Sequence, residues 1–246
     1  MHNRMRGAFN SDSSGIFAGM IRWRKWILLG MLGGIGGVIA DLVLLYQSGG
    51  DPQIYERNIW GDIWAFSESR LAAGHFMGIF MMPLQWFGLR AVLSRAGVDG
   101  TTRALAEIAA MLMVAVGLAY HGSLAFSARA FSRFAQMEFG SPALDLVEYH
   151  QAFFGPLEVA LLSLFVGLSF WLGVRLWSVP SLPKRLAWAN PILPFGLCAL
   201  LYISAPDIGN FLFPPAFNLS ILIFLSAVFF TGDAPLPKRP RWPEKH

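Results

Sequence analysis

The sequence predicts an all-α protein, a polytopic membrane helix bundle with about six transmembrane helices, and three observations favour this class. Of the 246 residues, 55% are hydrophobic and only 14% are charged, which is too apolar for an ordinary soluble domain. Six separate stretches each hold about 20 mostly apolar residues, the length that crosses a bilayer. Lysine and arginine gather at alternate ends of these stretches, as in membrane proteins of fixed topology.

The apolar stretches predict helices at 26–47, 71–91, 104–127, 147–174, 187–205 and 212–231. The first is too long for the core of a signal peptide and no convincing small-residue cleavage site follows it, so we expect an uncleaved anchor. The fourth is long enough to tilt or to project from the membrane.

Proline and glycine support these limits. A Ser-Gly-Gly-Asp-Pro run at 48–52 closes the first stretch, and Pro142 precedes the fourth. A Val-Pro-Ser-Leu-Pro run at 179–183 follows the fourth. Pro214 and Pro215 open the sixth, where a missing backbone donor is harmless.

The chain is expected to hold one folded domain between two tails. Residues 1–24 form a basic, cytoplasmic N-terminal tail, 25–231 the six-helix transmembrane domain, and 232–246 a disordered basic tail. Within the domain, 48–70 is expected to be an interfacial segment, because Trp60 and Trp64 fall on one face of a short helix.

Charge predicts the orientation. With both ends in the cytoplasm, Arg57, Arg70, Arg129 and Arg133 lie outside and the other 15 of the 19 lysines and arginines lie inside. We therefore expect a multi-pass protein of the cell membrane with the bilayer as its main partner. The net charge of +4 reflects this topology and not nucleic-acid binding, since no basic recognition motif is present. The single cysteine, Cys198, excludes an intrachain disulfide and Cys-based metal motifs.

Polar residues within the apolar stretches point to a site. An ionisable side chain inside a membrane costs a few kcal/mol, so such residues usually face the bundle interior and mark a pathway or a site. At 1.5 Å per residue, Asp41 lies roughly 22 Å and His121 roughly 25 Å above the inner ends of their helices. Asp207 and Asn210 are expected in the outer turn before the last helix. The set falls toward the outer half of the bilayer: Asp41, His75, His121, His150, Glu158, Asp207 and Asn210.

The helix at 147–174 carries two of these residues. His150, Phe154 and Glu158 are four residues apart and are expected to share a broad face. Pro156 should kink the helix between them, because it cannot donate a hydrogen bond to the carbonyl of Ala152. We expect His121, His150 and Glu158 to converge on one cavity, with Asp41 and His75 at its rim.

The segment before Asp41 predicts close helix packing. Glycines at 33–34 and 36–37 form two offset Gly-x-x-Gly steps, which let a neighbouring helix approach closely.

The favoured function is an intramembrane enzyme that performs acid–base chemistry on a lipid-soluble substrate such as an isoprenoid, sterol or acyl lipid. Buried histidine and carboxylate groups can divide the roles of acid and base. The candidate catalytic residues are His121, His150, Glu158 and Asp41. The candidate substrate-binding residues are His75, Trp86, Tyr120, Tyr202, Asp207 and Asn210, and Gln85 could also line the pocket.

Other interpretations stay open. Three histidines and Glu158 could hold a metal, or two histidines a haem, although their spacing matches no metal motif and no metal ligand or cofactor is assigned. A small transporter or a non-catalytic binding or assembly protein would also place polar residues in the membrane, although no inverted repeat is visible. Each histidine could instead serve only as an interhelical hydrogen-bond donor, and Asp207 as a helix cap. The oligomeric state is left open.

Overall fold

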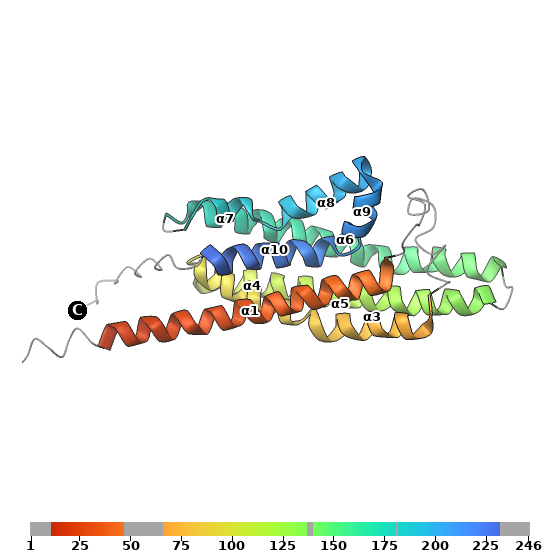
Figure 1. Cartoon of the computed structure of the whole chain (residues 1–246), viewed down its shortest axis with the longest axis horizontal. Helices are drawn as coiled ribbons and strands as arrows, with labels where there is room; N and C mark the ends of the chain where they lie inside the picture. Colours follow the sequence, from red (N-terminus) through yellow and green to blue (C-terminus); the bar gives the residue numbers. More distant parts are fainter. Residues whose placement is uncertain (1–10, 47–65, 137–139, 181, 232–246) are drawn as a thin grey trace, which may run out of the picture.

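The computed structural model describes residues 11–46, 66–136, 140–180 and 182–231. Within these ranges the chain is helical with short connections and contains no strand, which confirms the all-α class. The helices in chain order are α1 (Ser11–Leu45), α3 (Glu68–Met81), α4 (Leu84–Arg95), α5 (Gly100–Gln136), α6 (Gly140–Ser178), α7 (Arg185–Trp188), α8 (Ile192–Ser204), α9 (Pro206–Leu212) and α10 (Ala216–Thr231) (Figure 1).

Five segments are long and apolar enough to cross a membrane: Trp23–Leu45, Glu68–Arg95, Gly100–Ala130, Ala152–Ser178 and Arg185–Ser204. A sixth arises if α9 and α10, which meet at an angle of 76°, are counted as one broken span. The structure therefore confirms the polytopic helix bundle and its five to six spans.

Three predicted elements differ in detail from the helices observed. The span predicted at 71–91 consists of α3 and α4, with Pro83 at the start of α4. The span predicted at 187–205 consists of α7 and α8, with Pro191 before α8. Asp207 and Asn210 were expected in a turn, but they lie in the separate helix α9. A proline at the start of a helix loses no internal hydrogen bond, which is why these breaks coincide with prolines.

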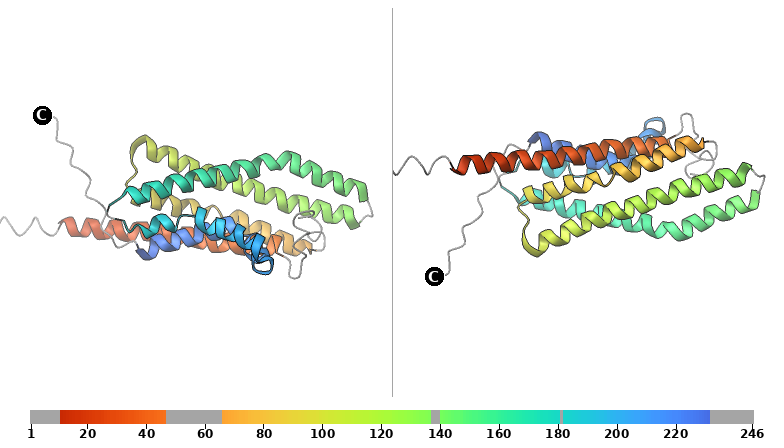
Figure 2. Two further views of the ribbon diagram at one scale, coloured as in Figure 1. Left: turned by 90° about the horizontal axis from the view of Figure 1, so that it is seen from above. Right: turned by 90° about the horizontal axis from the view of Figure 1, so that it is seen from below.

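Helix α1 is the central element of one layer and contacts α3, α4 and α10. Helices α5 and α6 pair along their length and extend beyond the other helices at one end (Figure 2). Helix α5 contacts α3 and α4, and α8 contacts α9 and α10. The main apolar core lies between these helices and includes Leu93, Phe165, Leu172, Phe224 and Leu225.

The two glycine steps of α1 face two different neighbours. A Cβ atom on Gly33 would lie 2.8 Å from the backbone nitrogen of Gln85 in α4. A Cβ atom on Gly37 would lie 2.6 Å from Cγ of Asn218 in α10. The predicted close approach is present, and the offset lets one helix receive a neighbour on each side.

Some predicted features lie outside the described residues, namely the segment with Trp60 and Trp64 and the tail at 232–246. Helix α1 already begins at Ser11, within the predicted N-terminal tail. Helix α6 continues through Pro156 and is visibly bent in Figure 2.

Candidate functional site

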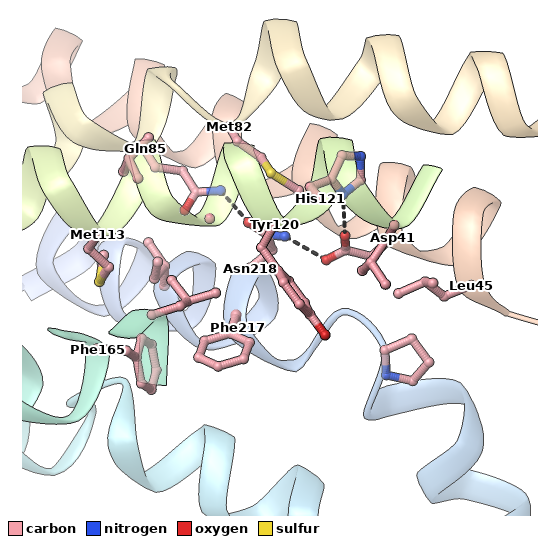
Figure 3. A pocket seen from close by; sticks show the side chains of 16 residues that line it. Asp41, Leu45, Met82, Gln85, Met113, Tyr120, His121, Phe165, Phe217 and Asn218 are labelled. Carbon is pink, nitrogen blue, oxygen red and sulfur yellow. Dashed lines mark hydrogen bonds and ion pairs between the residues drawn. The ribbon is translucent and has the colours of Figure 1, made fainter. Parts of the chain in front are cut away.

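A cavity of about 110 Å³ lies between α1, α5, α6 and α10 (Figure 3). This volume exceeds the roughly 10–15 Å³ that one water molecule requires. Its wall is mostly apolar and includes Leu45, Met82, Met113, Leu161, Phe165 and Phe217. Its polar residues are Asp41, Gln85, Tyr120, His121 and Asn218.

Asp41 and His121 form a buried pair in the cavity wall. Nδ1 of His121 lies 3.3 Å from Oδ1 of Asp41, and the two residues are 4% and 7% exposed, respectively. Nε2 of His121 lies 3.2 Å from the carbonyl oxygen of Gly74. A carbonyl oxygen only accepts hydrogen bonds, so Nε2 carries a hydrogen. The contact between Nδ1 of His121 and the carboxyl group of Asp41 needs one further proton, carried by either group. With that proton the pair has no net charge.

Two side-chain amides complete the network and determine which groups donate and which accept its hydrogen bonds. Nε2 of Gln85 donates to the carbonyl oxygen of Gly33 at 3.4 Å and to Oδ1 of Asn218 at 2.5 Å. The amide nitrogen of Asn218 therefore faces Asp41, and donates to Oδ2 at 2.6 Å. Both carboxyl oxygens of Asp41 thus have a partner. The network joins α1, α4, α5 and α10.

Glycines make room for these side chains. A Cβ atom on Gly78 of α3 would overlap the imidazole of His121 at Nε2, so only glycine leaves space for the ring there. Gly37 makes the same allowance for Asn218. The close helix packing that the glycines permit therefore also positions the polar network.

Tyr120 connects the cavity to Glu158. Its ring lines the cavity, and its hydroxyl group donates to Oε2 of Glu158 at 3.2 Å. Glu158 itself is exposed on the outer face of α6 and does not line the cavity.

The predicted convergence of His121, His150 and Glu158 on one cavity is wrong for the last two residues. Nδ1 of His150 lies 2.7 Å from the hydroxyl oxygen of Ser127, and the histidine is buried outside the cavity. Asp41, which was expected at the rim, is instead part of the wall.

The remaining candidates lie elsewhere. His75 stacks on His121 with ring centroids 6.5 Å apart, but it lines a separate cavity near Glu68. Trp86 donates to the carbonyl oxygen of Glu107 at 3.4 Å.

Three further candidates lie near the bend between α8 and α10. Tyr202 stacks on Phe213, with centroids 4.7 Å apart. Asp207 is exposed in the first turn of α9, and Asn210 is half-buried in the same helix. None of these three residues lines the cavity, although Pro214 between α9 and α10 does.

Sequence analysis missed Asn218. It lies near the start of the predicted sixth span. Because a polar amide in an apolar membrane segment is costly, its presence there could have indicated a functional residue. No group of three His, Cys, Asp or Glu side chains in the described ranges is arranged to hold a metal ion. Both ring nitrogens of His121 already face oxygen atoms of the protein.

Comparisons with known proteins add no activity to this description. No curated protein and no solved structure shows significant similarity to the chain. Residues 5–232 match the model of a family of unknown function (DUF6796). Because the match covers most of the sequence, the protein belongs to this family of unknown function.

Proposed function

We propose that the protein is an intramembrane enzyme that transfers a proton to and from a small, mostly apolar molecule held in the cavity. One observation carries this proposal: the carboxyl group of Asp41 lies in the cavity wall and shares a contact with His121. A positioned acid–base group of this kind typically accelerates a reaction about 10²–10⁴-fold.

Asp41 is the proposed catalytic residue. His121 is a positioning residue, because both of its ring nitrogens already face oxygen atoms of the protein. In the proposed reaction Asp41 donates a proton to the substrate, and the amide of Asn218 stabilises the carboxylate that remains. Recovery of a proton from another atom of the same substrate restores the neutral pair. An isomerisation or an elimination fits this requirement, because neither leaves a buried net charge behind.

The lining of the cavity indicates the class of substrate. Apolar residues form most of the wall, which favours an apolar body such as an isoprenoid, sterol or acyl chain. The polar group of the substrate would face Asp41.

A proton-coupled transporter is the second candidate. The observation that favours it is the position of proton-bearing groups at two surfaces of α5: His121 faces the buried carboxyl of Asp41, and Tyr120 bonds to the exposed Glu158. Transport would require both pairs and would leave the transported molecule chemically unchanged.

The test is a search for chemical conversion. The full-length protein, Asp41→Asn, Glu158→Gln and the control Asp207→Asn are each reconstituted in lipid nanodiscs and incubated with a total membrane lipid extract. Mass spectrometry and chromatography then compare the extract before and after incubation. We expect the wild type and Asp207→Asn to convert at least one component, and Asp41→Asn to convert it about 10²–10⁴-fold more slowly.

The outcomes separate the two candidates. Equal conversion by Asp41→Asn and the wild type would contradict the catalytic role of Asp41. Absence of any conversion, together with proton uptake by vesicles that requires both Asp41 and Glu158, would replace the enzyme with a transporter.

A further inference from the structure

A second cavity lies away from the candidate site, between the part of α1 that begins at Trp23, the end of α4 and the start of α5. Its volume is about 280 Å³. Aromatic and basic side chains form most of its wall, which consists of Trp23, Trp26, Phe87, Arg90, Ala91, Ser94 and Arg103. The proposed enzymatic function uses none of these residues.

One carboxylate holds the two arginines of this cavity in place. Glu107 accepts from Nε of Arg103 at 2.8 Å and lies 3.3 Å from Nε of Arg90. Nη2 of Arg103 also donates to the hydroxyl group of Ser94 at 3.0 Å. Among the described residues, the Nη groups of Arg90 and Nη1 of Arg103 have no protein acceptor. The cavity thus offers oriented guanidinium donors and an excess of positive charge.

Trp23 lies in the same wall and packs against two further arginines. It is 8% exposed, and in the described part of the chain its indole Nε1 has no acceptor. Its ring lies between two further cations, with the guanidinium carbon of Arg95 4.4 Å and that of Arg24 5.7 Å from the ring centroid. These two cations add positive charge beside the cavity wall that Trp23 forms.

The other side of the cavity is apolar and faces outward. Trp26 stacks on Phe87 with ring centroids 5.1 Å apart, and Trp26 remains 40% exposed. Both residues belong to helices long and apolar enough to span a membrane, so this surface is available to lipid chains. A ligand that fits both sides has an anionic head and an apolar chain.

We propose that this cavity binds the phosphate group of an anionic glycerophospholipid. The free guanidinium nitrogens of Arg90 and Arg103 bind the phosphate oxygens, a geometry that arginine forms more readily than lysine. An acyl chain lies over Trp26 and Phe87. Basic pockets between membrane helices near the bilayer surface are typical sites for such head groups.

The test measures lipid binding to the purified full-length protein by native mass spectrometry. The probes are dioleoylphosphatidylglycerol, dioleoylphosphatidylcholine and free glycerol phosphate. The variant Arg90→Gln/Arg103→Gln is compared with Arg175→Gln/Arg185→Gln, which removes two exposed arginines outside the cavity. We expect one phosphatidylglycerol to bind in preference to phosphatidylcholine. The cavity variant should lose about tenfold or more in affinity, because it loses charge-assisted hydrogen bonds, while the control retains wild-type binding.

A variant that is expected to bind more tightly tests whether misfolding explains the loss of lipid binding. Glu107→Gln removes the negative charge beside the phosphate but keeps a side-chain oxygen that can accept from Arg103. It should therefore bind phosphatidylglycerol more tightly than the wild type. The proposal fails if Glu107→Gln binds no more tightly, if both double variants lose binding equally, or if phosphatidylcholine binds as well as phosphatidylglycerol. Binding of glycerol phosphate with the affinity of the lipid would show that the acyl chain has no part in the site.

Discussion

At the scale of single residues, the candidate site depends on partners that are distant in the sequence. Asn218 and Asp41 are 177 positions apart, and Asn218 and Gln85 are 133 positions apart. Each member satisfies the next, so the network is stable as a unit and costly to interrupt. Asn218 is the member that forms hydrogen bonds with both Asp41 and Gln85.

Asn218→Ala should therefore destabilise the protein by about 1–3 kcal/mol, the usual cost of leaving buried polar groups without partners. The change removes the donor to Oδ2 of Asp41 and the acceptor of Gln85 together. Thermal unfolding in detergent measures the effect. The matched control is Ser226→Ala in the same helix, because the serine bonds only to the carbonyl oxygen of Leu222 one turn earlier. Equal melting temperatures for the two variants would show that the network adds no stability.

Sequence reasoning identified Asp41, His121 and Tyr120 because charged or polar groups in apolar spans are conspicuous. It misplaced Glu158 because residues four apart are about 40° out of phase on a helix, which amounts to about 80° over two steps. His150 accordingly faces the interior, Phe154 is half-buried and Glu158 is exposed. Asn218 was missed although its amide lies within the predicted sixth span.

At the scale of helices, glycine decides which surfaces approach. The two glycine steps of α1 were predicted to admit one neighbouring helix, and they admit α4 on one side and α10 on the other. The sequence pattern specifies that an approach occurs, but the identity of the partner depends on tertiary contacts that no local pattern encodes.

Gly37→Ala should destabilise the protein by about 1–3 kcal/mol, because overpacking of this size forces neighbouring groups to shift. The new Cβ atom would lie 2.6 Å from Cγ of Asn218. Gly167→Ala is the control in α6, since its Cβ atom would have no neighbour within 4 Å. There alanine should be neutral or stabilise by up to about 1 kcal/mol through its higher helix propensity. Unfolding temperatures that fall equally in both variants would contradict the specific contact.

Prolines lie at several breaks between helices, and hydropathy alone does not reveal where the chain changes direction. The hydropathy of 212–231 predicts a span, but it carries no information about the direction of the chain before Ala216. The bend of 76° between α9 and α10 was therefore not predictable from apolar content. Pro214 at this bend lines the cavity, so the bend also shapes the candidate site.

At the scale of the whole molecule, the sequence predicted the class and number of spans well, because both follow from segment length and polarity. It did not predict which polar residues meet, because that depends on the rotation of each helix about its axis. Two cavities result, with different characters. A neutral hydrogen-bonded pair lines the cavity among α1, α5, α6 and α10, and a basic aromatic cavity lies near Trp23.

The orientation of the bundle is the remaining prediction at this scale. Cys198 is the single cysteine and is buried, so a Cys198→Ala background lets one new cysteine report on its own position. Ser69→Cys and Asp99→Cys suit this purpose, since both residues are exposed at opposite ends of the Glu68–Arg95 span.

Because most arginines and lysines gather at the end that holds Asp99, that end should lie in the cytoplasm. A membrane-impermeant maleimide should then label Ser69→Cys in intact cells and Asp99→Cys only after the cells are broken. This orientation would place the basic cavity of Trp23, Arg90 and Arg103 in the leaflet that carries most anionic lipid. Labelling of Asp99→Cys alone in intact cells would invert the topology. It would also leave that cavity facing a leaflet poor in its proposed ligand, so the same measurement bears on both predictions.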